Sequence, residues 1–205
     1  MHGRHRGALL LSLLTTLCDA SRDGSNCPPG GLVARERMPL RTQAGAVVDK
    51  NACPVRFACV NWYGAHMELF SVDGLSKQPL ETIAARIVQL GFNCVRLPFS
   101  LQLLRDDPLV PDLALAANPE LRGIRGVELF DRTVAALTDV GLMVILNNHN
   151  SAAGWCCSGD SPEGIWHTDE YPIGVWYDSI SHMAARFRAN TLVVAFDIRN
   201  EIHDV

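Results

Sequence analysis

The chain has 205 residues, of which 48% are hydrophobic and 20% are charged, a balance that suits a globular protein with a buried core and excludes a disordered one. Its formal net charge is -4 at pH 7, and its 18 Lys and Arg residues are scattered without forming a basic stripe. Composition therefore gives no support for nucleic acid or a membrane surface as a partner.

The first twenty residues have the layout of a secretory signal peptide. A basic start precedes an apolar run at 7–17, and small residues follow near a plausible cleavage point. The run is too short to span a bilayer, which takes about 20 residues; a buried N-terminal helix is the alternative reading. No later segment is long and apolar enough to cross a membrane. We therefore predict a signal peptide at 1–20, a flexible leader at 21–31, and a secreted, extracellular protein.

Seven cysteines agree with export. Six remain after removal of the signal peptide, and an even number favours one or more disulfides. Without a Cys-x-x-Cys motif or a His pair at ligand spacing, no metal site is expected. Cys94 lies in an apolar run and is expected to be a core residue. Cys156 and Cys157 cannot readily bond to each other, so either is open to a bridge with a distant cysteine.

A single domain is expected over residues 32–205. Two extended segments at its start, 32–37 and 46–49, are expected to form a short hairpin packed on the domain. From Val55 onward, apolar strand segments alternate with amphipathic helices, which indicates βα units and a parallel sheet. The expected strands are 55–60, 93–97, 142–146 and 191–198.

Three helices are expected between these strands. The first begins near Pro79 and stops at Gly91, and the second covers 127–140. The third carries a stripe at helical spacing that is expected to face the core. This stripe consists of Trp176, Ile180, Met183 and Phe187. Pro98 is expected to close the second strand, and a long polar loop is expected over 100–125.

Four strands and three intervening helices make about half of a TIM (β/α)8 barrel, which has eight strands and about 250 residues. We therefore predict an α/β fold of this kind, truncated after about four βα units. A doubly wound open sheet has the same alternation, but no Gly-rich phosphate loop follows the first strand.

Substrates of βα barrels bind at the C-terminal ends of the strands, where the loops converge. Chemically active side chains occur at this end of every predicted strand. In chain order they are Asn61 and Trp62, then Arg96, then His149, and finally Asn200 with Glu201. Their common location predicts one active site.

Four stretches resemble glycoside hydrolase family 5, the cellulase-type retaining enzymes. They are VNWYGA at 60–65, GFNCVRLPFS at 91–100, VILNNHNSAAGWCC at 144–157 and VVAFDIRNEIHD at 193–204. The third stretch is most similar to the endoglucanase-like members of plants and microbes. The resemblance covers about residues 39–205 and only the first half of the family's catalytic domain.

The resemblance implies a role for each polar residue. Glu201 matches the general acid/base, and Asn200 matches the residue that hydrogen-bonds the sugar 2-hydroxyl. Arg96 matches the arginine that orients the nucleophilic carboxylate, and His149 matches a histidine lining the site. A glycosidic oxygen leaves poorly unless it is protonated, which agrees with an acid at this place. The alternatives are a structural ion pair for Arg96 and a core position for His149.

Three tryptophans on loops near the strand ends are candidates for substrate binding. Sugar rings present apolar faces that stack on indole, so Trp62, Trp155 and Trp166 suit a polysaccharide or oligosaccharide ligand. Loop packing is the alternative for Trp155 and Trp166. Trp176, as part of the helix stripe, is expected in the core.

The resemblance also implies a nucleophilic glutamate on a seventh strand, which this sequence lacks. We therefore expect a retaining hydrolase of β-glucan or a related polysaccharide that needs no cofactor, but whose half present in this chain is inactive alone. A non-catalytic secreted carbohydrate-binding protein of the same fold is the alternative. The sequence leaves the glycan and the oligomeric state open.

Overall fold

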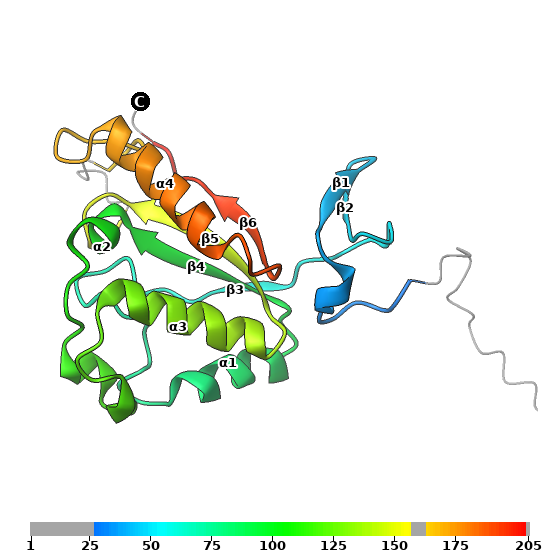
Figure 1. The fold of residues 1–205 in the computed structure, drawn as a ribbon, viewed down its shortest axis with the longest axis horizontal. Helices are drawn as coiled ribbons and strands as arrows, with labels where there is room; N and C mark the ends of the chain where they lie inside the picture. Colours follow the sequence, from blue (N-terminus) through cyan, green and yellow to red (C-terminus); the bar gives the residue numbers. More distant parts are fainter. Residues whose placement is uncertain (1–26, 157–162, 204–205) are drawn as a thin grey trace, which may run out of the picture.

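The computed structural model describes residues 27–156 and 163–203. At its centre lies a four-stranded parallel sheet in the order β3-β4-β5-β6 (Figure 1). The strands are β3 (Cys59–Asn61), β4 (Cys94–Ser100), β5 (Met143–Asn150) and β6 (Val193–Asp197). Helices α1 (Leu80–Gln89), α3 (Gly126–Asp139) and α4 (Ile173–Phe187) occupy the connections between them. The expected alternation of βα units is confirmed.

Local sequence explains the ends of α1. Pro79 precedes the helix, and the Leu80 amide donates to Asn118 Oδ1 at 2.8 Å, which satisfies one of the free donors of the first turn. Ala84 and Ile87 face the core. Gly91, at φ +88°, adopts the left-handed conformation that ends helices.

Helix α3 follows the same logic and buries a longer stripe. Leu129, Phe130, Val134 and Leu137 are all at most 2% exposed, and they pack over the sheet as one side of the helix. The helix ends before Gly141, whose φ of +87° turns the chain into β5. The predicted span was one residue off at each end.

Strand β4 runs through Pro98, so the expectation that this proline closes the strand is wrong. The last contact of β4 with the β3 side is the Trp62 amide donating to Arg96 O at 3.1 Å. Pro98, two residues later, faces the same side beyond the end of β3, where no amide donor is required. On its other side β4 continues to pair with β5, up to Ser100.

The segment expected as a polar loop, 100–125, starts with a short helix, α2 (Leu101–Asp106). Ser100 caps this helix, because its Oγ accepts from the Leu103 amide at 3.1 Å. Two 3-10 turns follow, at Asp112–Leu115 and Pro119–Leu121. The loop expectation was therefore wrong for residues 100–106, which end β4 and form α2.

The stripe of α4 is less buried than expected. Only Met183 is fully buried, and Trp176 is half-buried with its Nε1 donating to Ile198 O at 3.1 Å. Helix α4 lies beside β6, an edge strand whose side chains are half-buried or exposed. Trp176 is therefore not the core residue that the spacing predicted.

The expected N-terminal hairpin is present and its second strand lies where expected, but its first strand does not. It consists of β1 (Arg41–Gln43) and β2 (Ala46–Val48), joined by Ala44 and Gly45 at positive φ, whereas Arg35–Arg37 form a 3-10 turn. Val33 and Met38 pack against residues at the N-terminal ends of the sheet strands. The hairpin therefore sits at the end of the sheet opposite to the strand tips (Figure 1).

Two disulfides join parts of this N-terminal region, as the cysteine number suggested. Cys27 bonds Cys53, and Cys59 bonds Cys94 across the register of β3 and β4. Cys94 is fully buried, as expected, but it is a disulfide partner as well. The last part of the leader is tied to the domain by Cys27; the predicted signal peptide lies outside the described residues.

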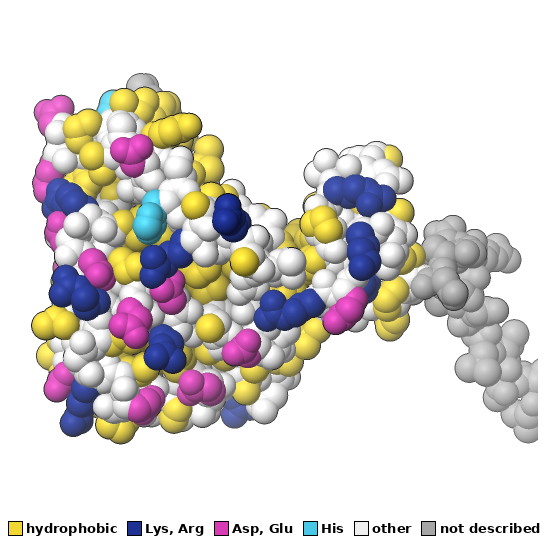
Figure 2. All heavy atoms as spheres, viewed as in Figure 1, with side chains coloured by type: hydrophobic (Ala, Val, Ile, Leu, Met, Phe, Trp, Pro, Cys, Tyr) yellow, Lys and Arg dark blue, Asp and Glu magenta, His cyan; other side chains and the backbone are white. Residues whose placement is uncertain are grey.

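The surface over α1 and α3 carries acidic and basic side chains interspersed, with no patch of one sign (Figure 2). None of the helices in residues 27–156 and 163–203 is long and apolar enough to cross a membrane.

We expect Leu137→Ala to lower the free energy of unfolding by about 2–5 kcal/mol, because this side chain is fully buried on the core-facing side of α3 and its removal leaves a cavity. The matched control is Leu113→Ala, at a leucine that is 68% exposed, which should change it by less than about 0.5 kcal/mol. Urea denaturation measures both. Equal losses would contradict the position of the core.

Candidate active site

A pocket of about 380 Å³ opens at the C-terminal ends of the sheet strands. Its lining consists of Asn61, Tyr63, His66, Arg96, Pro98, His149, Trp155, Cys156, Asn200 and Glu201. Of the residues singled out at the strand ends, all five polar ones are therefore neighbours in space, although Asn61 and Glu201 are 140 positions apart in the chain. The arrangement follows from parallel pairing, which brings all strand tips to one edge.

Arg96 is the hub of this pocket. Its Nε and Nη2 donate to Asp197 Oδ2 at 2.8 and 2.5 Å, and Nη2 also donates to Asn200 Oδ1 at 2.8 Å. Asn147 Nδ2 donates to the same Asp197 oxygen at 3.1 Å. Arg96 thus forms the structural ion pair considered as an alternative, and at the same time holds a residue of the predicted site.

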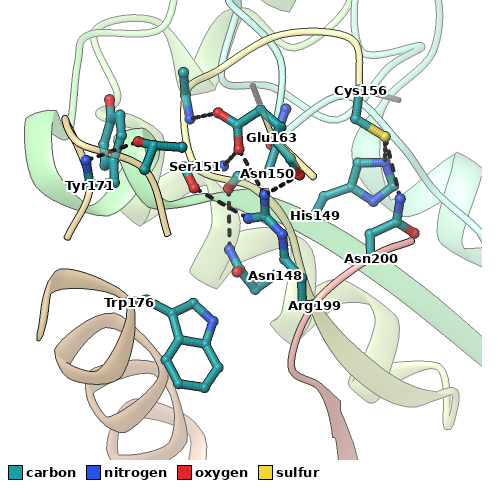
Figure 3. A network of polar contacts seen from close by, with 12 residues as sticks. Asn148, His149, Asn150, Ser151, Cys156, Glu163, Tyr171, Trp176, Arg199 and Asn200 are labelled. Atoms are coloured by element: carbon teal, nitrogen blue, oxygen red, sulfur yellow. Dashed lines mark hydrogen bonds and ion pairs between the residues drawn. The ribbon is translucent and has the colours of Figure 1, made fainter. Parts of the chain in front are cut away.

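The side-chain amide of Asn200 is held from both ends. Its Oδ1 accepts from Arg96, and its Nδ2 donates to Cys156 Sγ at 3.3 Å, a sulfur that is disulfide-bonded (Figure 3). Its backbone amide donates to Asn148 O at 3.0 Å. These contacts fix which end of the amide carries the donors.

Two histidine rings pack together at the floor of the pocket. His66 and His149 have ring centroids 4.3 Å apart, and His66 is only 2% exposed. Burial and the Arg96 charge lower the pKa of His66 to about 4. Burial, then His66, then the charges of Arg96 and Arg199 lower the pKa of His149 to about 3. Both imidazoles are therefore neutral above pH 5.

His149 is also fixed by polar neighbours. Its Nδ1 lies 2.8 Å from Asn147 Oδ1, and its Nε2 lies 3.4 Å from Cys156 Sγ. It is half-buried and belongs to the end of β5, so it is both a packed residue and a pocket residue.

Glu201 borders the pocket with an exposed side chain and an unusual backbone. Its φ is +35°, a left-handed backbone value that residues other than glycine rarely adopt. His203 Nδ1 lies 2.5 Å from Glu201 O. Strained residues of this kind cluster at functional sites and persist only where neighbours hold them.

The three tryptophans predicted to bind sugar lie in different environments, and one of them lines the pocket. Trp62 is 6% exposed and belongs to the core, with Nε1 donating to Asp73 O at 2.8 Å, so the expectation that it lines the cleft is not met. Trp155 is 75% exposed at the pocket and meets Tyr63 edge-on at 6.3 Å. Trp166 is half-buried against Trp176 and is not among the pocket residues.

Sequence reasoning missed Tyr63 and His66 as pocket residues. The signal that could have found them is their position within five residues of the end of β3, in the stretch that begins with Asn61. In the part of the chain that the structure describes, no group of three His, Cys, Asp or Glu side chains could hold a metal ion.

The histidine pair predicts a pH dependence of stability. Both folded pKa values lie below the unfolded value of about 6.5, so the unfolded chain takes up protons first and stability falls as the pH drops below 6.5. Replacing His66 by Phe should reduce the loss of unfolding free energy between pH 7 and pH 5 by about 1–2 kcal/mol. Urea denaturation at both pH values measures it.

The control for this prediction is His182→Phe, on the exposed side of α4. It should leave the pH dependence as it is in the unchanged protein. An equal effect of both substitutions would contradict the origin of the dependence in the buried pair.

Comparison with known proteins agrees with this geometry. The family model for cellulase (glycosyl hydrolase family 5) matches residues 48–205. A glycosyl hydrolase 5 family protein of Chamaecyparis obtusa is 36% identical over 182 residues, which are 80% of this chain and 33% of that protein. An endoglucanase of Paenibacillus polymyxa is 26% identical over 162 residues, covering 79% of this chain and 39% of the relative.

Solved structures show the same fold. The catalytic domain of the major endoglucanase from Xanthomonas campestris pv. campestris superposes with a TM-score of 0.70 at 26% identity, covering 81% of this chain and 46% of that one. An endocellulase from Pyrococcus horikoshii in complex with cellotetraose gives a TM-score of 0.72 at 24% identity, over 81% of this chain and 44% of that one. These neighbours are TIM-barrel endoglucanases.

The chain spans from about a third to less than half of the length of these relatives. The family model, however, covers well over half of the chain itself. The chain belongs to glycosyl hydrolase family 5, the cellulase family.

Proposed function

We propose that this chain carries part of the active site of a retaining glycoside hydrolase that cleaves a β-glucan or a related polysaccharide. The observation that carries the proposal is the pocket in which Glu201 and Asn200 lie beside Arg96 and His149 at the strand tips. A relative named endoglucanase and a structural neighbour, an endocellulase solved with cellotetraose, support the same substrate class.

Glu201 is the proposed general acid/base. Its exposed carboxyl group borders the pocket, where it can protonate the oxygen of the leaving sugar and later take a proton from water. Asn200 borders the pocket with its Oδ1 turned to Arg96 and its Nδ2 turned to Cys156 Sγ, and a side-chain amide at this place suits a sugar hydroxyl. The neutral His149 adds a polar wall without a charge.

A retaining reaction needs a second carboxylate about 5–5.5 Å from the first. Among the described residues, Glu201 is the one carboxylate that lines the pocket. Asp197 lies close by but is engaged by Arg96 and Asn147. We therefore propose that this polypeptide by itself binds glucan without cleaving it, and that the nucleophile is a glutamate outside it.

The same observation favours a second candidate, a non-catalytic carbohydrate-binding protein. Coding sequence downstream of position 205 that adds four βα units and a glutamate on the seventh strand would support the enzyme. A transcript that ends at Val205, together with binding but no cleavage, would support the binding protein.

An extracellular location is part of the proposal. Disulfides persist in oxidising compartments, and this chain has two between described cysteines. A relative from Xanthomonas campestris is named a major extracellular endoglucanase.

We expect the purified chain to bind cellotetraose, and Trp155→Ala to weaken this binding by about three- to ten-fold, since the exposed indole at the pocket offers a stacking face. The matched control is Trp166→Ala, which removes an indole that does not line the pocket and should leave binding unchanged. Isothermal titration calorimetry measures the dissociation constants. Absence of binding by the unchanged chain would refute the proposed substrate.

In a polypeptide that also carries the nucleophile, Glu201→Gln should reduce cleavage of cello-oligosaccharides by about 10²–10⁴-fold while binding is kept. An aryl cellobioside provides the internal control, because its leaving group needs little protonation and its first bond cleavage should be far less affected. Product analysis over time measures both reactions. Unchanged hydrolysis of the oligosaccharide would rule out the assigned role.

A further inference from the structure

A buried ion pair lies directly behind the pocket. Arg199 Nη2 donates to Glu163 Oε2 at 2.8 Å, and the side chains are only 1% and 10% exposed (Figure 3). Neither residue lines the pocket. Arg199 directly precedes Asn200, whereas Glu163 belongs to the connection between β5 and α4.

The carboxylate of Glu163 organises the start of its own connection. Oε2 accepts from the Ser151 amide at 2.7 Å and Oε1 from the Ala152 amide at 2.9 Å. Burial raises the pKa of Glu163, but these two amides and the Arg199 guanidinium outweigh it and hold the pKa below its ordinary value. The group is therefore a carboxylate at neutral pH.

Arg199 also links the chain that follows β6 to the connection between β5 and α4. Besides the ion pair, its Nη2 donates to Glu163 O at 2.9 Å and its Nη1 to Ser151 Oγ at 3.3 Å. One guanidinium thus joins the first residue after β5 to a point twelve residues later. Lysine, with a single nitrogen, could not make this set of contacts.

Contacts of the same connection flank Glu201 on both sides. Arg199 is held before it, and beyond it the His203 amide donates to Gly164 O at 2.8 Å. Residues 163–164 therefore contact the chain on both sides of Glu201, at Arg199 and at His203. Between these points Glu201 keeps its left-handed backbone, a conformation that needs such external support.

Stability alone explains this ion pair poorly. Removing two charges from water offsets much of their attraction, so a buried pair often contributes no more than apolar side chains do. In addition, Arg199 Nε is buried without a hydrogen-bond partner in the part of the chain that the structure describes. A role in geometry accounts for the pair better.

We propose that Glu163 and Arg199 are positioning residues that hold Asn200 and Glu201 in the conformation that meets the sugar. The inference rests on the proposed function, because it assigns the purpose of the pair to Glu201 as acid/base and to Asn200 as a sugar-binding amide. Glu163 and Arg199 themselves touch neither substrate nor reacting atoms.

The test compares Glu163→Gln and Arg199→Lys in the full chain. Glu163→Gln keeps a hydrogen-bond acceptor but removes the charge. Arg199→Lys keeps the charge but removes the planar guanidinium with its two terminal nitrogens. The matched control is Glu170→Gln, which breaks the exposed pair with Arg105 (3.0 Å) in the same connection. Nuclear magnetic resonance follows the side-chain amide of Asn200 and the Cα of Glu201, whose chemical shift reports φ.

Both site variants should move or broaden the Asn200 and Glu201 signals and weaken cellotetraose binding by about ten-fold, the loss of roughly one sugar hydrogen bond. Glu170→Gln should change neither. Unchanged Asn200 and Glu201 signals in both site variants would overturn the inference. Should Glu163→Gln fail to fold, Arg199→Lys gives the same readout.

Failure of the inference and failure of the proposed function are distinguishable. If the unchanged chain does not bind cellotetraose, the proposed function fails, but the two resonances still report whether the ion pair sets the conformation. If binding is normal and the resonances do not respond to either substitution, the positioning role alone is wrong.

Discussion

The ion pair between Arg96 and Asp197 is the contact on which the arrangement of the pocket depends. It joins β4 to β6 across β5, and Asn147 of the intervening strand donates to the same carboxylate oxygen. Side chains thereby link three neighbouring strands close to the C-terminal end of the sheet. Nη2 of Arg96 donates to Asn200 Oδ1 as well, so the guanidinium that links the strands also holds a residue just beyond β6.

Periodicity predicted the helices well and the strand ends poorly. The stripe of α3 and the glycine after it are local signals, and the observed helix agrees within one residue at each end. The end of β4 depends instead on its neighbour, because Pro98 is tolerated only where β3 has already ended. Pairing of this kind joins segments that are distant in sequence, and no local pattern reports it. The capped helix α2 was missed because six residues show too little periodicity.

The pocket could be predicted in part for a similar reason. His149, Asn200 and Glu201 lie at or beyond the ends of strands, and Arg96 of β4 pairs in register with Asn61, the last residue of β3, so parallel topology alone brings them together. Which way each side chain points was not predictable. Trp62 turns into the core although its neighbours Asn61 and Tyr63 line the pocket. His66 lies five residues beyond the end of β3, and its contact with His149 joins parts of the chain that no local pattern relates.

The backbone of Glu201 bears on whether the residue is kept for chemistry. At a φ of +35° glycine or asparagine would fit with less strain, and relief of such strain is worth about 1 kcal/mol or more. A protein that only bound sugar could exchange this glutamate for glycine and gain stability without disturbing the surrounding chain. Under the proposed function, the strain at this backbone position is stability given up so that a carboxylate can stand beside the sugar, a compromise that is common at catalytic sites.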